Sequence, residues 1–126
     1  MQLISRHELA FVTATLMYRG RVVEIPNALV DTGAASTVIN ADLAADAGIY
    51  LAANDQLRRF RGVGGHEHVF LRRVGRFAVG ARGLDGFDVE IGEMDDGFEI
   101  GGIIGMDFLR AAHAIIDLGN LTIEFA

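Results

Sequence analysis

An aspartate directly follows a short apolar run in the first third of the chain. The run 28–30 reads Ala-Leu-Val, and Asp31, Thr32 and Gly33 come next, followed by Ala34 and Ala35. A carboxylate at the end of a buried strand costs several kcal/mol unless it is hydrogen-bonded or protonated. A carboxyl group held in this way can serve as a general acid or base. A simple Asx-type turn beside a glycine would contain the same three residues, so the tripeptide alone leaves both interpretations open.

The residue types that are missing limit the other chemistry. The 126 residues include no Cys and no Trp, and all 11 basic residues are Arg. Without Cys there are no disulfides, thiolate nucleophiles or Cys-based metal sites. Without Lys there is no Schiff base and no P-loop lysine. Acid–base or nucleophilic work therefore falls to Asp, Glu, His, Ser, Thr or Tyr.

Length and charge set further bounds. A chain of 126 residues that is 51% hydrophobic, with a net charge of -6, predicts one soluble domain over 1–126. The acidic balance argues against a nucleic-acid partner. We expect no membrane segment, since no apolar run approaches roughly 18 residues. The segment 1–8 has no apolar h-region, so no signal peptide is expected and a cytoplasmic location is the default. A piece of a longer, anchored protein would look the same.

The first part of the chain predicts β-strands. Residues 8–18 are apolar and rich in Val, Thr, Phe and Tyr, and 21–25 alternate weakly, so Arg19 and Gly20 are expected to turn a hairpin. Pro26 is expected to interrupt the second strand before the short buried strand 28–30. The 16 glycines suit a β fold that is dense in turns.

Two short helices are predicted. Residues 41–47 are rich in Ala, with Asn40 as a good N-cap and Gly48 as the left-handed residue that ends the helix. A second helix is expected over 107–112, with Asp107 as its cap.

The remaining segments predict further strands. A long hairpin is expected from 56–61 and 66–79 around a glycine-rich tip at 62–65, followed by strands over 87–91 and 103–104 and by a last hairpin from 114–117 and 121–125.

Charge divides unevenly between two neighbouring segments. Residues 58–82 carry seven Arg and one acid, whereas 85–99 carry seven acids and no base. We favour the interpretation that these are adjacent strands whose outward side chains pair across the sheet. A basic rim on a substrate cleft is the alternative.

Three features in this order resemble a known family. They are the strand and turn 28–37, the glycine-rich hairpin 60–66, and the segment 103–109, in which Ile103 and Ile104 precede Gly105 and a short helix. Together they resemble the retropepsin-like aspartic proteases, the single-domain relatives of pepsin, over about 9–125. The resemblance implies an all-β, closed barrel-like acid protease fold with one or two short helices, equivalent to half of a pepsin.

The resemblance also implies roles for individual residues. Asp31 matches the catalytic aspartate, Thr32 matches the residue that grips the opposite subunit, and Gly33 matches the glycine whose carbonyl borders the substrate. Substrate contacts are expected from Ala34, Ala35, Ile103 and Ile104 and from a flap tip at Val63, Gly64 and Gly65. Retroviral enzymes usually carry acidic residues just after the turn, where this chain has Ala35 and Ser36, so the subsites are expected to differ.

The chemistry of this family then predicts an assembly. Two carboxylates a few ångströms apart share one proton and activate a water that attacks the scissile peptide carbonyl. The chain has one Asp-Thr-Gly, and Asp107 and Asp117 lack its hairpin and turn context. We therefore expect an aspartic endopeptidase that works as a C₂ homodimer on peptide or protein substrates, without cofactor or metal. The terminal segments 1–8 and 121–126 are candidates for an intersubunit sheet.

Other functions stay open. The same fold could serve as a non-catalytic dimerising or peptide-binding module that clamps a strand by β-augmentation, or as a protease that processes only its own precursor. His66 and His68 lie two apart on a strand, whereas the zinc-protease pattern needs two His four apart on a helix, so no metal site is expected. Nothing points to a Ser-His-Asp triad.

Overall fold

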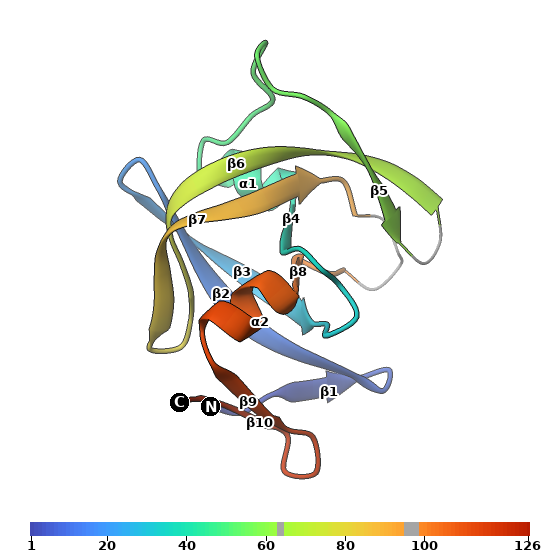
Figure 1. Cartoon of the computed structure of the whole chain (residues 1–126), viewed down its shortest axis with the longest axis vertical. Coiled ribbons are helices and arrows are strands. Elements are labelled where there is room, and N and C mark those ends of the chain that lie inside the picture. The colour runs from blue at the N-terminus through green and yellow to red at the C-terminus, as the bar shows by residue number, and fades with distance from the viewer. Residues whose placement is uncertain (63–64, 95–98) are drawn as a thin grey trace.

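β-Strands make up most of the molecule, together with two short helices. The computed structural model describes residues 1–62, 65–94 and 99–126 (Figure 1). The elements are β1 (Ile4–Arg6), β2 (Leu9–Tyr18), β3 (Arg21–Val30), β4 (Val38–Asn40), α1 (Ala41–Asp46), β5 (Arg58–Gly62), β6 (Gly65–Val79), β7 (Arg82–Gly92), β8 (Gly102–Ile104), α2 (Met106–Ala111), β9 (Ala114–Asp117) and β10 (Thr122–Phe125).

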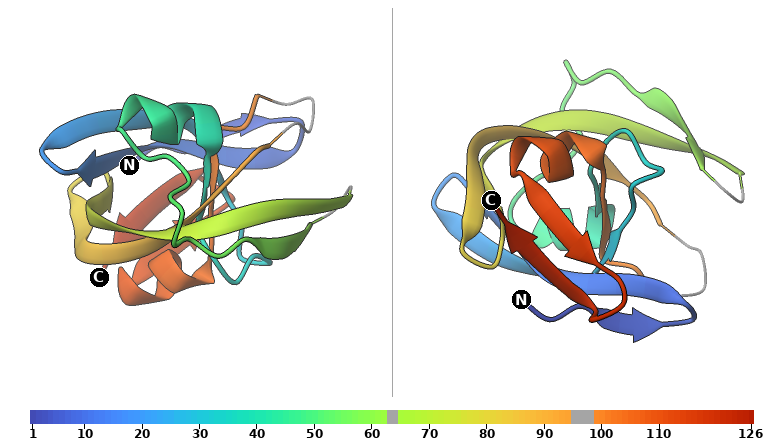
Figure 2. Two further views of the ribbon diagram at one scale, coloured as in Figure 1. Left: turned by 90° about the horizontal axis from the view of Figure 1, so that it is seen from above. Right: turned by 60° about the horizontal axis from the view of Figure 1, so that its bottom comes forward.

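The large sheet curls back on itself. Its strand order is β1-β2-β3-β8-β4-β7-β6-β5, and β2 also pairs with β6, so the strands from β2 round to β6 follow one another in a barrel-like ring (Figure 2). Strands β9 and β10 form a separate two-stranded sheet. The sequence-based expectation of a mainly β fold with one or two short helices is confirmed.

The core fills this ring and anchors α2 to it. Phe77 of β6 is fully buried, and its ring lies edge-on to the ring of Phe108 at 5.2 Å. Phe87 of β7 stacks on Phe77 at 5.8 Å and meets Phe108 edge-on at 5.9 Å. Such aromatic pairs stabilise a core beyond the area they bury. Because Phe108 belongs to α2, this cluster fixes the helix against the sheet.

The first hairpin turns where the sequence predicts, but β3 does not stop at Pro26. Arg19 and Gly20 both have positive φ (47° and 83°), as a two-residue hairpin loop requires. Strand β3 continues through Pro26 to Val30, so the predicted interruption is wrong. The β2–β3 register shifts opposite this point, and Asn27 has a positive φ of 53°. Such an irregularity accommodates a proline, which cannot donate to the ladder.

Helix α1 forms where the sequence predicts it, whereas α2 begins at a different residue and with a different cap from those predicted. The Asn40 side chain accepts a hydrogen bond from Asp42 N at 2.8 Å, and Gly48 follows the helix with a φ of 84°. Helix α2 begins at Met106 with Gly105 as its N-cap, so Asp107 lies inside the first turn and is not the cap. Neither of these six-residue helices in the described ranges is long enough to cross a membrane.

The two oppositely charged segments lie on neighbouring strands. Arg73 on β6 contacts Asp88 on β7 at 3.2 Å, and Arg76 contacts Asp85 at 2.9 Å. These pairs confirm the interpretation that the charges meet across the sheet.

The two termini lie side by side and pair within the chain (Figure 1). Leu3 N donates to Leu121 O at 2.7 Å, and Ile123 N donates to Met1 O at 2.9 Å. These bonds place the first three residues along one edge of β10, so the segments proposed from the sequence for an intersubunit sheet bind each other here.

Candidate active site

Asp31 stands at the end of β3 in a turn that fixes its carboxylate. Gly33 N donates to Asp31 Oδ1 at 2.9 Å, and Ala34 N donates to the Asp31 carbonyl at 3.2 Å. The Asp31 N–H donates to Ile104 O on β8 at 3.0 Å, which continues the parallel pairing of β3 with β8. Asp31 is half-exposed, and Thr32 and Gly33 are exposed. The carboxylate is therefore held in place yet open to solvent.

The first residues of α2 hold this turn through backbone hydrogen bonds. Met106 N donates to Ala34 O at 2.8 Å, and Asp107 N donates to Ala35 O at 3.2 Å. The first N–H groups of a helix have no partner within the helix, so they are free to bind carbonyls elsewhere. Here they hold the backbone of the two residues expected to border the substrate.

A buried polar network joins the end of the turn to α2. The Thr37 side chain is fully buried. Its hydroxyl donates to Asp107 Oδ1 at 2.7 Å and accepts from Gly105 N at 3.1 Å, while Thr37 N donates to Asp107 Oδ2 at 3.1 Å. Phe108 N also donates to Asp107 Oδ1 at 2.7 Å. Both oxygens of Asp107 are thus engaged in holding the turn.

Sequence reasoning missed this network. The sequence predicts Asp107 as the cap of the second helix and predicts no contact for Thr37. A Thr six residues after Asp31 and an Asp two residues after Gly105 give no local signal of contact, since 70 positions separate them in the chain.

Gly105 allows α2 to approach the turn this closely. A Cβ at this position would overlap the carbonyl oxygen of Ser36 and lie 2.6 Å from its carbonyl carbon. The φ of Gly105 is -93°, which any residue adopts. The requirement for glycine is therefore one of space and not of backbone conformation.

The other predicted site residues lie in different environments. Ile103 on β8 is half-buried, whereas the Ile104 side chain is 1% exposed and packs in the core, so Ile104 meets the site through its carbonyl oxygen. Val63 and Gly64 lie outside the described residues. Gly65 begins β6 and pairs with Gly62 of β5. Figure 1 shows the β5–β6 hairpin on the same side of the molecule as the turn after β3.

A partly buried ion pair anchors the loop that leads into β5. Arg72 on β6 contacts Asp55 at 2.6 Å, and the two side chains are 17% and 14% exposed. Arg72 also donates to the Tyr18 hydroxyl at 3.3 Å and to Tyr50 O at 3.1 Å. Burial acts to lower the pKa of Arg72, but the Tyr18 hydrogen bond and the Asp55 charge outweigh it, so the pKa lies above its ordinary value. The guanidinium stays charged and holds the loop.

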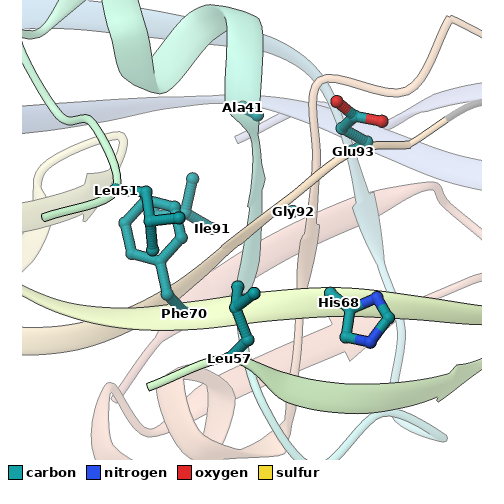
Figure 3. A pocket seen from close by; sticks show the side chains of 8 residues that line it. All are labelled: Ala41, Leu51, Leu57, His68, Phe70, Ile91, Gly92 and Glu93. Atoms are coloured by element: carbon teal, nitrogen blue, oxygen red, sulfur yellow. The ribbon is translucent and has the colours of Figure 1, made fainter. Parts of the chain in front are cut away.

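One cavity lies away from Asp31. It has a volume of about 450 Å³ and lies between α1, the loop before β5 and strands β6 and β7. In Figure 3, Phe70, Ile91 and Leu51 cluster at one end, with His68 and Glu93 toward the other. None of residues 31–35 lines it. The described ranges also contain no cluster of three or more acidic, His or Cys residues that could hold a metal ion.

A second groove of about 420 Å³ borders the turn itself. Thr32 lines it together with Met106 and Arg110 of α2 and with Ala114 and Ile116 of β9. It connects the candidate active site with the β9–β10 hairpin.

Comparisons with known proteins agree with this geometry. The sequence profile of a family described as aspartyl protease matches residues 13–108, a range that includes the Asp31 turn, β8 and the start of α2. The structure is similar to the crystal structure of a retropepsin-like aspartic protease from Rickettsia conorii, with a TM-score of 0.70 and 18% identity over 97% of this chain and 86% of that chain. No curated protein matches the sequence. The chain therefore belongs to the aspartyl protease family and has the retropepsin-like fold.

Proposed function

We propose that the chain is an aspartic endopeptidase in which residues 1–126 act as one protease domain and Asp31 activates the attacking water. One observation carries this proposal. The Asp31 carboxylate is fixed by Gly33 N at 2.9 Å while the residue stays half-exposed, in a turn held by β8 and α2. A general base needs such a fixed position with access to its substrate.

A second copy of the chain supplies the second carboxylate. The mechanism needs two carboxyl groups that share one proton. Asp107 is committed to Thr37 and Phe108, so it is not available for this role. We therefore propose a C₂ homodimer with the two Asp31 residues at the axis, where the exposed Thr32 of each copy contacts the other.

The reaction needs only these two groups and water. The ionised carboxylate takes a proton from water as the water oxygen attacks the carbonyl carbon, and the protonated carboxyl donates a hydrogen bond to the carbonyl oxygen. The tetrahedral intermediate collapses when the C–N bond breaks and a proton passes to the leaving amine. No covalent bond to the protein forms.

The substrate is an extended peptide with apolar residues beside the scissile bond. Gly33, Ala34 and Ala35 border its backbone, and the half-buried Ile103 contacts a side chain. The β5–β6 hairpin, in which Gly62 pairs with Gly65, serves as the flap that covers the peptide.

Peptide cleavage tests the proposal. Asp31→Asn keeps the size of the side chain but cannot act as a base, and we expect it to lower cleavage of a peptide library at mildly acidic pH by roughly a hundredfold or more. Asp46→Asn, an exposed acid at the end of α1, is the matched control and is expected to cleave normally. Activity retained by Asp31→Asn would refute the mechanism. Peptide binding without cleavage at any pH would identify a binding module instead.

A further inference from the structure

The loop between α1 and β5 presents large apolar side chains to solvent. Tyr50, Leu51 and Leu57 are 65%, 54% and 54% exposed. Single apolar residues scattered over a surface are normal, whereas apolar residues that gather in one place mark an interaction site. These three side chains lie within residues 50–57, so the loop has the composition of such a site.

Polar contacts hold this loop in one conformation. Arg72 on β6 donates to Tyr50 O at 3.1 Å and to Asp55 Oδ2 at 2.6 Å. Ala52 N donates to the same Asp55 oxygen at 2.6 Å, and Asp55 N donates to Ala52 O at 3.0 Å. A loop that is already fixed loses little conformational entropy when it binds a partner, so its exposed side chains are preorganised for binding.

Two of the exposed side chains border the cavity of about 450 Å³ between α1 and the strands β6 and β7. Leu51 and Leu57 line it together with the buried Phe70 of β6 and Ile91 of β7 (Figure 3). Ligand pockets in proteins have volumes of about 300–1,000 Å³. An apolar side chain placed in this cavity would remove Leu51 and Leu57 from water, which favours its binding.

The other end of the cavity carries ionisable groups. His68 of β6 and Glu93, which follows β7, both line it and are exposed. Glu93 forms no ion pair with any other residue that the structure describes. It also begins the segment 93–99, which contains four acids and no base, whereas Arg58 of β5 and Arg72 of β6 do not line the cavity. The charge at this end therefore favours a basic group on the occupant.

The cavity is separate from the catalytic turn and lies at the open end of the β5–β6 hairpin. None of residues 31–35 lines it, whereas His68 and Phe70 belong to β6 and Leu57 directly precedes β5. Figure 1 shows the chain between α1 and β5 on the same side of the molecule as this hairpin. A partner bound in the cavity would therefore lie beside the proposed flap and leave the Asp31 turn uncovered.

We propose that this cavity is an exosite, a second binding site that recruits a protein substrate through a segment other than the one that is cut. The segment carries a large apolar side chain followed by a basic residue. The apolar side chain packs among Leu51, Leu57 and Phe70, and the basic group pairs with Glu93. The ring N–H of His68 donates to a backbone carbonyl of the segment. The recruiting role rests on the proposed protease function, whereas binding itself needs no catalysis.

A binding experiment tests the exosite without chemistry. The probe is the fluorescein-labelled peptide Gly-Ser-Gly-Phe-Arg-Gly-Ser, titrated into the Asp31→Asn variant of the full chain so that it stays intact. We expect its dissociation constant, measured by fluorescence anisotropy, to be at least tenfold lower than that of the same peptide with Ser in place of Phe or Glu in place of Arg. Equal affinities for the three peptides, or tighter binding of the Glu peptide, would overturn the proposal.

Two exposed residues allow the exosite to be altered without changing the core. We expect Leu51→Ser and Glu93→Arg each to raise the dissociation constant of the Phe-Arg peptide at least fivefold, with unchanged circular dichroism spectra. Glu93→Arg should also bind the Glu peptide more tightly than wild type does, because the charge is reversed. Val22→Ser and Glu24→Arg, at exposed positions on β3, are the matched controls and should bind normally. Full binding by both exosite variants would overturn the proposal.

Cleavage of a linked substrate tests the recruiting role. A peptide that the wild-type chain cleaves is joined to the Phe-Arg segment by a flexible Gly-Ser linker of about 12 residues, which spans roughly 20 Å. We expect the added segment to lower KM at least fivefold with little change in kcat, because binding at one site raises the local concentration at the other. Leu51→Ser should lose this gain and still cleave the unlinked peptide normally. An equal gain in Leu51→Ser would overturn the proposal.

Binding and cleavage together separate the exosite from the proposed chemistry. Selective binding of the Phe-Arg peptide by a chain that cleaves no peptide would support the binding site and refute the protease function. Cleavage by a chain that binds the three probe peptides equally would refute the exosite and leave the chemistry standing. A change in the sedimenting mass of Leu51→Ser would identify this face as a contact between copies of the chain and overturn the proposal.

Discussion

Thr37 and Asp107 are 70 positions apart in the chain and are joined by two hydrogen bonds. The Thr37 hydroxyl donates to Asp107 Oδ1 at 2.7 Å, and the Thr37 N–H donates to Oδ2 at 3.1 Å. This contact ties the end of the Asp31 turn to the first turn of α2. Phe108 fixes α2 in the core. Because Asp107 belongs to the same helix, its hydrogen bonds to Thr37 hold the end of the Asp31 turn against this fixed helix.

Replacing Thr37 by Val should destabilise the fold. The substitution keeps the shape of the side chain but leaves Gly105 N without an acceptor and Asp107 Oδ1 with one donor fewer, at a fully buried position. We expect a loss of about 2 kcal/mol in the free energy of unfolding measured with urea. Thr13→Val, at an exposed position on β2, is the matched control and should change stability little. Equal stabilities of the two variants would contradict the importance of the network.

Gly105 should tolerate no side chain. Gly105→Ala places a methyl group against the Ser36 backbone, which cannot move without shifting the Asp31 turn. We expect a loss of roughly 3 kcal/mol or a failure to fold. Gly119→Ala is the matched control, because its Cβ would meet only the Asp117 Oδ1 atom at an ordinary 3.4 Å. Thermal unfolding of both variants gives the comparison, and a Gly105→Ala variant as stable as Gly119→Ala would contradict the close packing.

Two adjacent arginines on β6 should differ in importance. Arg72→Met removes a half-buried ion pair and frees the loop before β5, so we expect a loss of about 1–3 kcal/mol and an increase in KM for peptides as that hairpin loses its anchor. Arg73→Met removes a pair whose side chains are 69% and 46% exposed, and it should cost no more than about 0.5 kcal/mol. Urea unfolding and steady-state kinetics measure both effects. A larger loss of stability for Arg73→Met than for Arg72→Met would contradict the prediction that the buried ion pair matters more.

Asp117 should make stability depend on pH in the acid range. Hydrogen bonds from the backbone and then the side chain of Asn120 lower the pKa of Asp117 below its ordinary 3.8. A carboxyl whose folded pKa is lowered stabilises the fold above its unfolded pKa, and this contribution disappears as pH falls through the folded pKa. Asp117→Asn should therefore be less stable than wild type near pH 6, with the difference shrinking below about pH 3.8. An NMR titration of Asp117 and urea unfolding across this range check it, and a difference that grows on acidification would contradict the prediction.

Local sequence signals predicted the elements whose causes are local. Arg19-Gly20 marks its hairpin because the turn needs two residues with positive φ, and Asn40 marks the start of α1 because its side chain satisfies a free N–H. The prediction that Pro26 interrupts the second strand is wrong, because a proline usually ends a strand unless the pairing with the partner strand shifts register. That shift, opposite Val12 and Ala14, depends on how β2 and β3 pair and leaves no mark near Pro26.

The sequence by itself determined the family, the order of the elements and the Asp31 turn, because these depend on the identity and spacing of neighbouring residues. Only the tertiary structure decided that Asp107 holds the turn through Thr37, since that contact depends on the path of the chain around the ring. The tertiary structure also covers β10 with the N-terminal residues and leaves β9 open. Pairing between distant segments is set by packing of the whole molecule, and no local pattern of residues encodes which edge stays free.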